Sequence, residues 1–313
     1  MAPTNPRILP YGEAAIAEAA ALIAAGQCVA VPTETVYGLA ADATDSAAVA
    51  GIYAAKGRPA FNPLIVHVPD LAAAERIATF DDAARDLATR FWPGPLTLVL
   101  PLRADAGIAS LVTAGLSTIA VRVPAHRAMQ ALLAASGRPL AAPSANASGA
   151  ISPTRAAHVA ASLAGRIPLV IDDGATPAGL ESTIVMDGRI LRPGPLTAAA
   201  LGLPEPAGTT EAITAPGQLA SHYAPAKPLR LDATEREGDE WLIGFGAVAG
   251  DDNLSPSGDP VEAAARLFDA LHRADSAPPR AIAVAPVPHA GIGAAINDRL
   301  RRAAHPRPSS QIE

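Results

Sequence analysis

The sequence predicts an α/β protein of two domains joined by a linker. Short runs rich in Val, Ile and Leu alternate with Ala-rich helical segments up to residue 203, and the alternation resumes after residue 228. Residues 204–228 contain five prolines and no apolar periodicity, which is typical of an extended linker. We therefore expect a mixed-sheet domain over residues 1–203, a linker over 204–228 and a small Rossmann-like α/β domain over 229–313.

The first domain is predicted to contain about seven strands with helices packed on them. Gly26 and Gly137 each follow a helical segment and suit the left-handed position that ends a helix. Ser152 and Pro153 predict a further helix start, with Ser as the cap and Pro in the first turn. The other expected helices cover residues 13–25, 45–55, 81–91 and 126–136, and the expected strands cover 28–31, 64–68, 96–100, 118–123, 140–142, 169–171, 182–186 and 190–191.

The second domain is predicted to be a small β-α-β-α unit. Its expected strands cover residues 229–231, 241–245 and 281–284, and its expected helices cover 261–272 and 292–304. Residues 251–260 are Gly, Ser, Asp and Pro for the most part, so we expect a loop there.

Composition and charge exclude several classes of protein. Residues 1–203 hold 14 Lys and Arg against 15 Asp and Glu, and residues 204–313 hold 10 against 15, so neither part has the basic excess of a duplex-binding module. The single cysteine, Cys28, lies in an apolar run and indicates a buried thiol in a reducing compartment. No apolar run reaches the ~20 residues of a membrane helix, and Glu13 and Glu18 interrupt the Ala-rich opening, so we expect no secretory signal and a cytoplasmic protein.

The common motifs of catalytic and cofactor sites are missing from the sequence. There is no G-x-x-x-x-G-K phosphate loop, no paired Cys and His spacing for zinc and no G-x-S-x-G elbow. The G-F-G at residues 244–246 and the G-I-G at 291–293 lack the full dinucleotide fingerprint and are interpreted as turns at strand ends. We therefore predict no protein-held metal site.

Polar side chains gather at the predicted strand ends of the first domain, where open α/β sheets build their sites. Each has a plainer interpretation alone: His67 as a core histidine, Arg122 as an outward strand residue, Ser144 and Asn146 as turn formers. Together, four cations with hydroxyls and amides, and no evident proton-transfer pair, favour the binding of phosphate and carboxylate. The set comprises Thr35, Lys56, Arg58, Asn62, His67, Thr118, Arg122, Ser144, Asn146, Ser152, Ser182 and Arg192.

Lys56 is the most specific member of this set. The chain has only two lysines, Lys56 and Lys227, against 22 arginines, so a lysine kept beside Arg58 suggests a task for a compact ammonium. A solvated loop charge is the alternative.

Several motifs resemble those of the YrdC-like family. K-G-R-P at residues 56–59 and P-S-A-N at 143–146 resemble its K-x-R and S-x-N signature. Further matches are P-T-E-T-V-Y-G-L at 32–39, N-P-L-I-V-H at 62–67, F-W-P-G-P-L-T at 91–97, E-S-T-I-V at 181–185 and R-P-G at 192–194. The S-H-Y-A-P in the linker and G-A-A-I-N-D-R-L near the C-terminus are similar to the family's longer branch, which has two domains. The resemblance implies a twisted, open mixed sheet in the first domain.

The resemblance also implies a reaction and its partners. L-threonine, bicarbonate or CO2, and ATP with Mg2+ would give threonylcarbamoyl-AMP, diphosphate and water. The product would pass to the tRNA threonylcarbamoyl transferase machinery, for threonylcarbamoyladenosine beside the anticodon. Such a reaction needs alignment and cations against the charge that spreads over the reacting phosphate.

The family pattern assigns roles to individual residues of this sequence. Lys56 and Arg58 are implied to be catalytic, with Lys56 near the reacting phosphate or carbamate. The threonine site would comprise Thr35, His67, Arg122, the Ala142 backbone and Ser182, and the ATP site would comprise Arg58, Asn62, Thr118, Ser144, Asn146, Ser152, Arg192 and Tyr223.

The linker carries Ser221, His222 and Tyr223, and spacers rarely include aromatic residues. The resemblance implies that the linker crosses the mouth of the site, with Tyr223 on the nucleotide and the small domain as a lid that excludes water.

Two other functions are alternatives for this sequence. An RNA-binding module is one, since YrdC-like domains have been linked to double-stranded RNA, but the near-neutral and acidic domains argue against stable tRNA binding. A hydrogenase-maturation carbamoyltransferase is the other, but the zinc-finger and acylphosphatase parts of such proteins are missing from this sequence.

Overall fold

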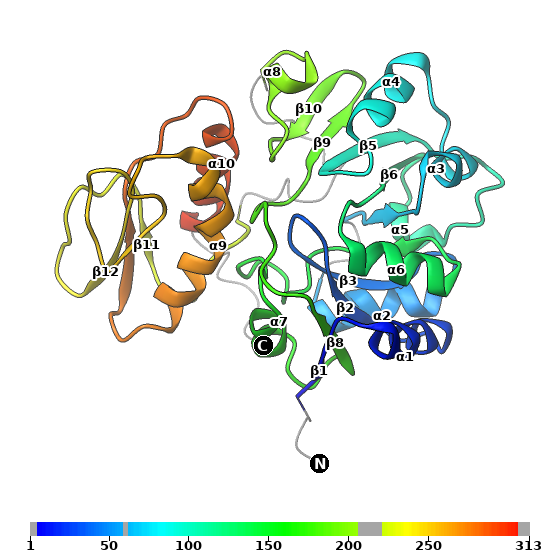
Figure 1. Ribbon diagram of the computed structural model, residues 1–313, viewed down its shortest axis with the longest axis horizontal. Helices are drawn as coiled ribbons and strands as arrows, with labels where there is room; N and C mark the ends of the chain where they lie inside the picture. The colour runs from blue at the N-terminus through cyan, green and yellow to red at the C-terminus, as the bar shows by residue number, and fades with distance from the viewer. Residues whose placement is uncertain (1–4, 59–61, 206–220, 306–313) are drawn as a thin grey trace.

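The computed structural model describes residues 5–58, 62–205 and 221–305. Figure 1 shows a larger body built on one extended sheet and a smaller body beside it, formed by the C-terminal part of the chain. Within the described residues, no helix is both long and apolar enough to cross a bilayer. Residues 206–220 of the predicted linker lie outside the described residues, so its boundaries stay predictions.

The larger body contains a ten-stranded mixed sheet, which confirms the predicted fold class. Its strands are β1 (Arg7–Pro10), β2 (Val29–Pro32), β3 (Tyr37–Asp42), β4 (Ile65–His67), β5 (Leu96–Pro101), β6 (Thr118–Arg122), β7 (Leu140–Ala141), β8 (Leu169–Asp172), β9 (Thr183–Met186) and β10 (Arg189–Arg192). They follow the order β1-β8-β2-β3-β7-β4-β6-β5-β9-β10.

The number of about seven strands was too low: eight of the ten strands overlap the expected ranges, and β1 and β3 were not predicted. The sequence of β3 is Y-G-L-A-A-D, and Gly and Ala are weak strand formers outside a sheet. Antiparallel partners on both sides, β2 and β7, hold it in place.

Helices cover both faces of the sheet. α1 (Glu13–Ala24) and α6 (Arg127–Ser136) pack against the face that receives Val29 and Val31 of β2. α2 (Ser46–Lys56) packs against the opposite face, which receives Ala30. The alternation of side chains along β2 therefore places one residue set in each core.

The remaining helices of the first domain are short: α3 (Leu71–Ile77), α4 (Asp82–Phe91), α5 (Ser110–Thr113), α7 (Ala156–Ser162) and α8 (Ala198–Leu201). α2 and α4 begin at the acidic caps Asp45 and Asp81, and Gly57 ends α2 in the left-handed conformation. The predicted helix start at Ser152 and Pro153 was wrong, since α7 begins at Ala156. The Ser152 hydroxyl caps no helix because it donates to Glu181 instead.

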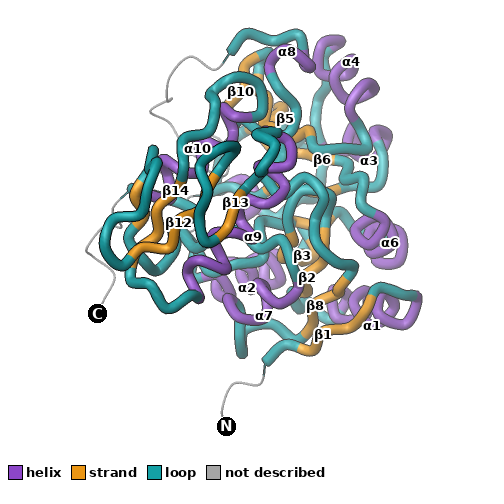
Figure 2. Tube along the Cα trace, turned by 60° about the vertical axis from the view of Figure 1, so that its left-hand side comes forward, coloured by secondary structure: helices purple, strands orange, loops and turns teal. Residues whose placement is uncertain are grey.

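The smaller body contains four parallel strands, β11 (Leu229–Arg230), β12 (Glu240–Gly244), β13 (Asp252–Asn253) and β14 (Ala281–Val284), in the order β11-β14-β12-β13. The loop predicted at residues 251–260 contains the short strand β13. α9 (Pro260–Ser276) and α10 (Gly293–Ala304) lie between this sheet and the first domain (Figures 1 and 2).

The two domains share one apolar cluster. Val36, Ile151 and Leu180 of the first domain join the core formed by α9, α10 and the smaller sheet. At Gly179 the backbones meet, and a Cβ there would lie 2.5 Å from the Ala264 carbonyl oxygen. Only glycine fits this contact, so the domains are docked closely.

Two stacked histidines also cross this interface. The rings of His158 on α7 and His272 on α9 lie 3.8 Å apart and almost parallel. Asp269 accepts hydrogen bonds from Arg155 and Arg273 beside them. Burial, and after it the neighbouring His272, lower the pKa of His158 to about 3. Burial also lowers the pKa of His272.

These histidines predict a stability that depends on pH. The unfolded chain takes up protons below about pH 6.5, whereas folded His158 stays neutral, so stability falls as the pH drops from 6.5 towards 3. Between pH 7 and pH 5 we expect His158→Gln to remove up to about 2 kcal/mol of this loss. Urea unfolding of the wild type and of His158→Gln at the two pH values measures this difference in the free energy of unfolding. Exposed His289→Gln is the control, and equal losses in all three proteins would contradict the prediction.

Candidate active site

A cavity lies where strands of the larger sheet end and the linker passes. The parallel strands β4 and β6 pair His67 directly with Arg122, which brings these side chains together at one edge. Arg192 ends β10, and Ser182 precedes β9. Of the predicted set, the cavity is lined by Thr35, Arg58, His67, Arg122, Ala142, Ser144, Ser182, Arg192 and Tyr223.

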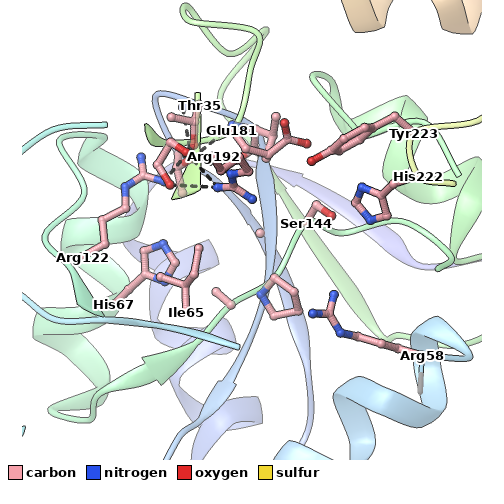
Figure 3. A pocket seen from close by; sticks show the side chains of 16 residues that line it. Thr35, Arg58, Ile65, His67, Arg122, Ser144, Glu181, Arg192, His222 and Tyr223 are labelled. Carbon is pink, nitrogen blue, oxygen red and sulfur yellow. Dashed lines mark hydrogen bonds between the residues drawn. The ribbon is translucent and has the colours of Figure 1, made fainter. Parts of the chain in front are cut away.

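Arg122, His67 and Thr35 form one end of the cavity (Figure 3). The Arg122 guanidinium donates to the Thr35 hydroxyl at 2.9 Å and to Glu34 Oε1 at 2.5 Å. Burial raises the pKa of the Glu34 carboxyl, but the charge and hydrogen bond of Arg122, together with backbone hydrogen bonds, bring it below its ordinary value. This end therefore contains an arginine fork that is already paired with a carboxylate.

His67 lies beside this arginine and is neutral. Burial lowers its pKa to about 3, and the positive charge of Arg122 acts in the same direction. Its Nδ1 is buried without a hydrogen-bond partner among the described residues. A neutral imidazole with one open nitrogen is suited to a polar ligand at this end.

Arg58, His222 and Tyr223 form the other end of the cavity (Figure 3). Arg58 donates to the Pro63 carbonyl at 2.9 Å, and burial lowers its pKa to about 10. His222 is also buried, and burial with nearby Arg58 holds its pKa well below the usual value. The Tyr223 hydroxyl has no hydrogen-bond partner among the described residues.

Arg192 and Glu181 lie between the two ends (Figure 3). Arg192 donates to the Ser182 carbonyl at 2.9 Å and to its hydroxyl at 3.1 Å. The cavity thus has arginines at both ends and in the middle, an arrangement for anionic groups in a row.

Comparisons with known proteins show the family of this chain. A family model described as "Telomere recombination" matches residues 21–194, and one described as "Threonylcarbamoyl-AMP synthase, C-terminal domain" matches residues 189–305. The threonylcarbamoyl-AMP synthase of Bacillus subtilis is 40% identical over 92% of each chain. The chain belongs to the threonylcarbamoyl-AMP synthase family.

Further members of this family support the assignment. The threonylcarbamoyl-AMP synthase of Pyrococcus abyssi is 41% identical over 91% of this chain and 92% of the relative. The crystal structure of P. abyssi Sua5 complexed with L-threonine matches with a TM-score of 0.87 and 37% identity, over 95% of this chain and 97% of that chain.

Five residues that the family pattern predicts do not line the cavity. Lys56 is fully buried behind it, and its ammonium donates to the carbonyls of Ser144 at 2.5 Å and Asn146 at 2.6 Å. Burial and the adjacent Arg58 hold the pKa of Lys56 well below the usual value. The other four are Asn62, Thr118, Asn146 and Ser152. Their roles toward a ligand stay predictions.

Sequence reasoning assigned no role to Glu34, Glu181 and Arg299. Glu34 and Glu181 lie within family motifs. Two acidic residues among so many cations could have indicated that they pair with arginines of the site. Arg299 also lies in a quoted motif, at residues 293–300, but it is 118 residues from Glu181, and no local pattern shows that the two are partners.

The cavity is narrow, with about 40 Å³ for the centres of water-sized atoms. One water needs roughly 10–15 Å³ of such space, so the cavity as it stands admits a few waters. A nucleotide would require its walls to move.

We predict that Lys56→Ala lowers both stability and activity. It leaves buried carbonyls without a donor, which costs about 1–3 kcal/mol for each, and frees the Ser144 loop. Urea unfolding and diphosphate release measure the two effects. Lys227→Ala is the matched control, because that ammonium donates to the Ala274 and Ala277 carbonyls away from the cavity. A Lys56→Ala variant with normal turnover would contradict the prediction.

Proposed function

We propose that the protein is an L-threonylcarbamoyladenylate synthase, a nucleotidyltransferase that makes threonylcarbamoyl-AMP and diphosphate from L-threonine, bicarbonate or CO2, and ATP. The observation that carries the proposal is one cavity with an arginine and a neutral histidine at one end and further arginines along it. The names of the relatives and the L-threonine complex of P. abyssi Sua5 support it.

Threonine would bind at the end formed by Thr35, His67 and Arg122. The Arg122 fork suits a carboxylate, which would take the place of Glu34 as its partner. The neutral His67 nitrogen and the Ala142 backbone, with Ser182, would orient the side chain and amine.

The nucleotide would occupy the end formed by Arg58, Ser144 and Tyr223, with Arg192 near the phosphates. The threonine amine bonds to the carbon of CO2 and loses a proton, which gives a carbamate. A carbamate oxygen then attacks the α-phosphorus in line, and the bond to the leaving diphosphate breaks. The arginines would stabilise the charge that spreads during this displacement.

Mg2+ would enter with the nucleotide. The described residues hold no group of three or more His, Cys, Asp or Glu that could bind a metal ion. The Glu181 carboxylate is already bonded to Ser152 and Arg299. Magnesium often relies on phosphates and waters with few protein ligands. A cavity lined by arginines and hydroxyls, with no free carboxylate cluster among the described residues, fits an ion held in that way.

The linker would act as a lid. Its Tyr223 and His222 line the cavity, and the Ala224 N–H donates to the Gly149 carbonyl at 2.8 Å. Displacement of this segment would admit ATP, and its return would exclude water from the labile carbamate and mixed anhydride. The product would then pass to a tRNA threonylcarbamoyl transferase.

The test is product formation by the full chain. With ATP, Mg2+, L-threonine and bicarbonate we expect diphosphate and threonylcarbamoyl-AMP in equal amounts, by coupled assay and mass spectrometry. Omission of threonine or bicarbonate should abolish both. Diphosphate release that ignores threonine would refute the proposal.

Arg122→Lys should weaken threonine binding selectively. An ammonium keeps the charge but loses the fork, so we expect KM for threonine to rise roughly tenfold or more and KM for ATP to stay within about threefold. Steady-state kinetics with each substrate varied measures the split. Arg127→Lys is the control, since Arg127 is exposed and pairs with Asp173 outside the cavity. Equal rises in both constants would contradict the prediction.

A further inference from the structure

Arg299 of α10 joins three parts of the chain through one buried side chain. It is the largest fully buried residue of those described, with 0% exposure. Its Nε donates to Glu181 Oε2 at 3.0 Å, and its Nη1 donates to the Pro193 carbonyl at 2.7 Å and to Asp298 at 3.0 Å. The C-terminal domain therefore inserts a positive charge into the first domain.

Glu181 is the partner that links Arg299 to the cavity. Its side chain lines the cavity in the middle, beside Arg192 (Figure 3). One carboxylate oxygen accepts from Arg299 and the other accepts from the Ser152 hydroxyl. Both oxygens are thus engaged away from any ligand, and their charge is compensated from the second domain.

Tyr223 is a second partner. The Arg299 guanidinium carbon lies 5.3 Å from the centre of the Tyr223 ring, within the range of a cation–π interaction. Phe268 of α9 packs on the same ring at 5.5 Å. The linker residue at the nucleotide end is therefore held by two helices of the C-terminal domain.

An unpaired Glu181 would harm nucleotide binding. A carboxylate on the cavity wall repels a triphosphate, and burial strengthens that repulsion. Without Arg299, Glu181 could also turn to Arg192 and occupy a cation that the phosphates need. The Nη2 of Arg299 is buried without a hydrogen-bond partner among the described residues, so this guanidinium is held by Glu181, Pro193 and Asp298 rather than by a full set of bonds.

We propose that Arg299 is a positioning residue for the nucleotide: by compensating Glu181 and holding Tyr223, it lets the docked C-terminal domain form the wall of the ATP end. This inference rests on the function proposed above. Arg299 acts through these two residues rather than on the reacting atoms. Loss of Arg299 should therefore raise KM for ATP far more than KM for threonine, because threonine would bind at the opposite end.

The experiment compares full-length variants in steady-state diphosphate release and in direct titration with ATP and Mg2+. Arg299→Gln should raise KM for ATP roughly tenfold or more and KM for threonine by less than about threefold. Adding Glu181→Gln to that variant should lower KM for ATP at least about threefold, because no unpaired carboxylate remains; what is left above the Glu181→Gln single variant measures the effect through Tyr223. Arg299→Lys should be intermediate.

Arg155→Gln is the matched control. Arg155 also bridges the domains, to Asp269 at 2.8 Å, but lies outside the cavity lining. If Arg299 only holds the domains together, both variants will raise the two KM values alike, or the double variant will bind ATP no better than Arg299→Gln. Either result would overturn the inference.

Two further measurements keep the test decisive. Direct ATP titration does not need turnover, so a wild-type protein that binds ATP but releases no diphosphate refutes the proposed reaction while the ATP affinities still decide on Arg299. Thermal unfolding checks folding. If Arg299→Gln does not fold, Arg299→Lys and the double variant supply the comparison, and equal ATP affinity for Arg299→Lys and the wild type would count against a requirement for the fork.

Discussion

The buried ammonium of Lys56 is the interaction on which the site depends. It ends α2 and bonds to the carbonyls of residues 144 and 146, so a helix on one face of the sheet is tied to the loop that follows β7. Arg58 follows it by two residues and Ser144 lies in the loop, and both reach the cavity. The carbonyls of this loop stabilise the charged form of Lys56, which burial and Arg58 disfavour, so the shape of the loop affects the pKa of the lysine.

The cavity compensates its acidic groups internally. Glu34 pairs with Arg122 at one end, and Glu181 pairs with Arg299 in the middle. Arg122, which would receive an anionic ligand, is thus matched by a carboxylate in advance, which limits the cost of burying its charge. An anion that binds at this end must replace Glu34 as the partner of Arg122. The strength of the Arg122–Glu34 pair therefore sets how selective the binding is.

The sequence was most informative where a local pattern decides the structure. The apolar runs at residues 64–68 and 118–123 predicted β4 and β6, and the family motifs predicted most of the cavity lining, from Thr35 to Arg192. β3 was missed because its Gly and Ala residues acquire strand structure only from their neighbours. The partners of Lys56, and the pairing of Glu181 with Arg299, depend on how distant segments dock, which no periodicity encodes.

The backbone contact at Gly179 gives the molecule a mechanical property. Most interdomain surfaces meet through side chains, which can turn and absorb small displacements. Here main chain touches main chain, two residues before Glu181, with no compliant layer between. A shift of α9 towards the first domain therefore presses directly on the backbone next to the cavity wall. The docked C-terminal domain therefore constrains the backbone next to Glu181 directly, through a residue, Gly179, whose side chain is a single hydrogen atom.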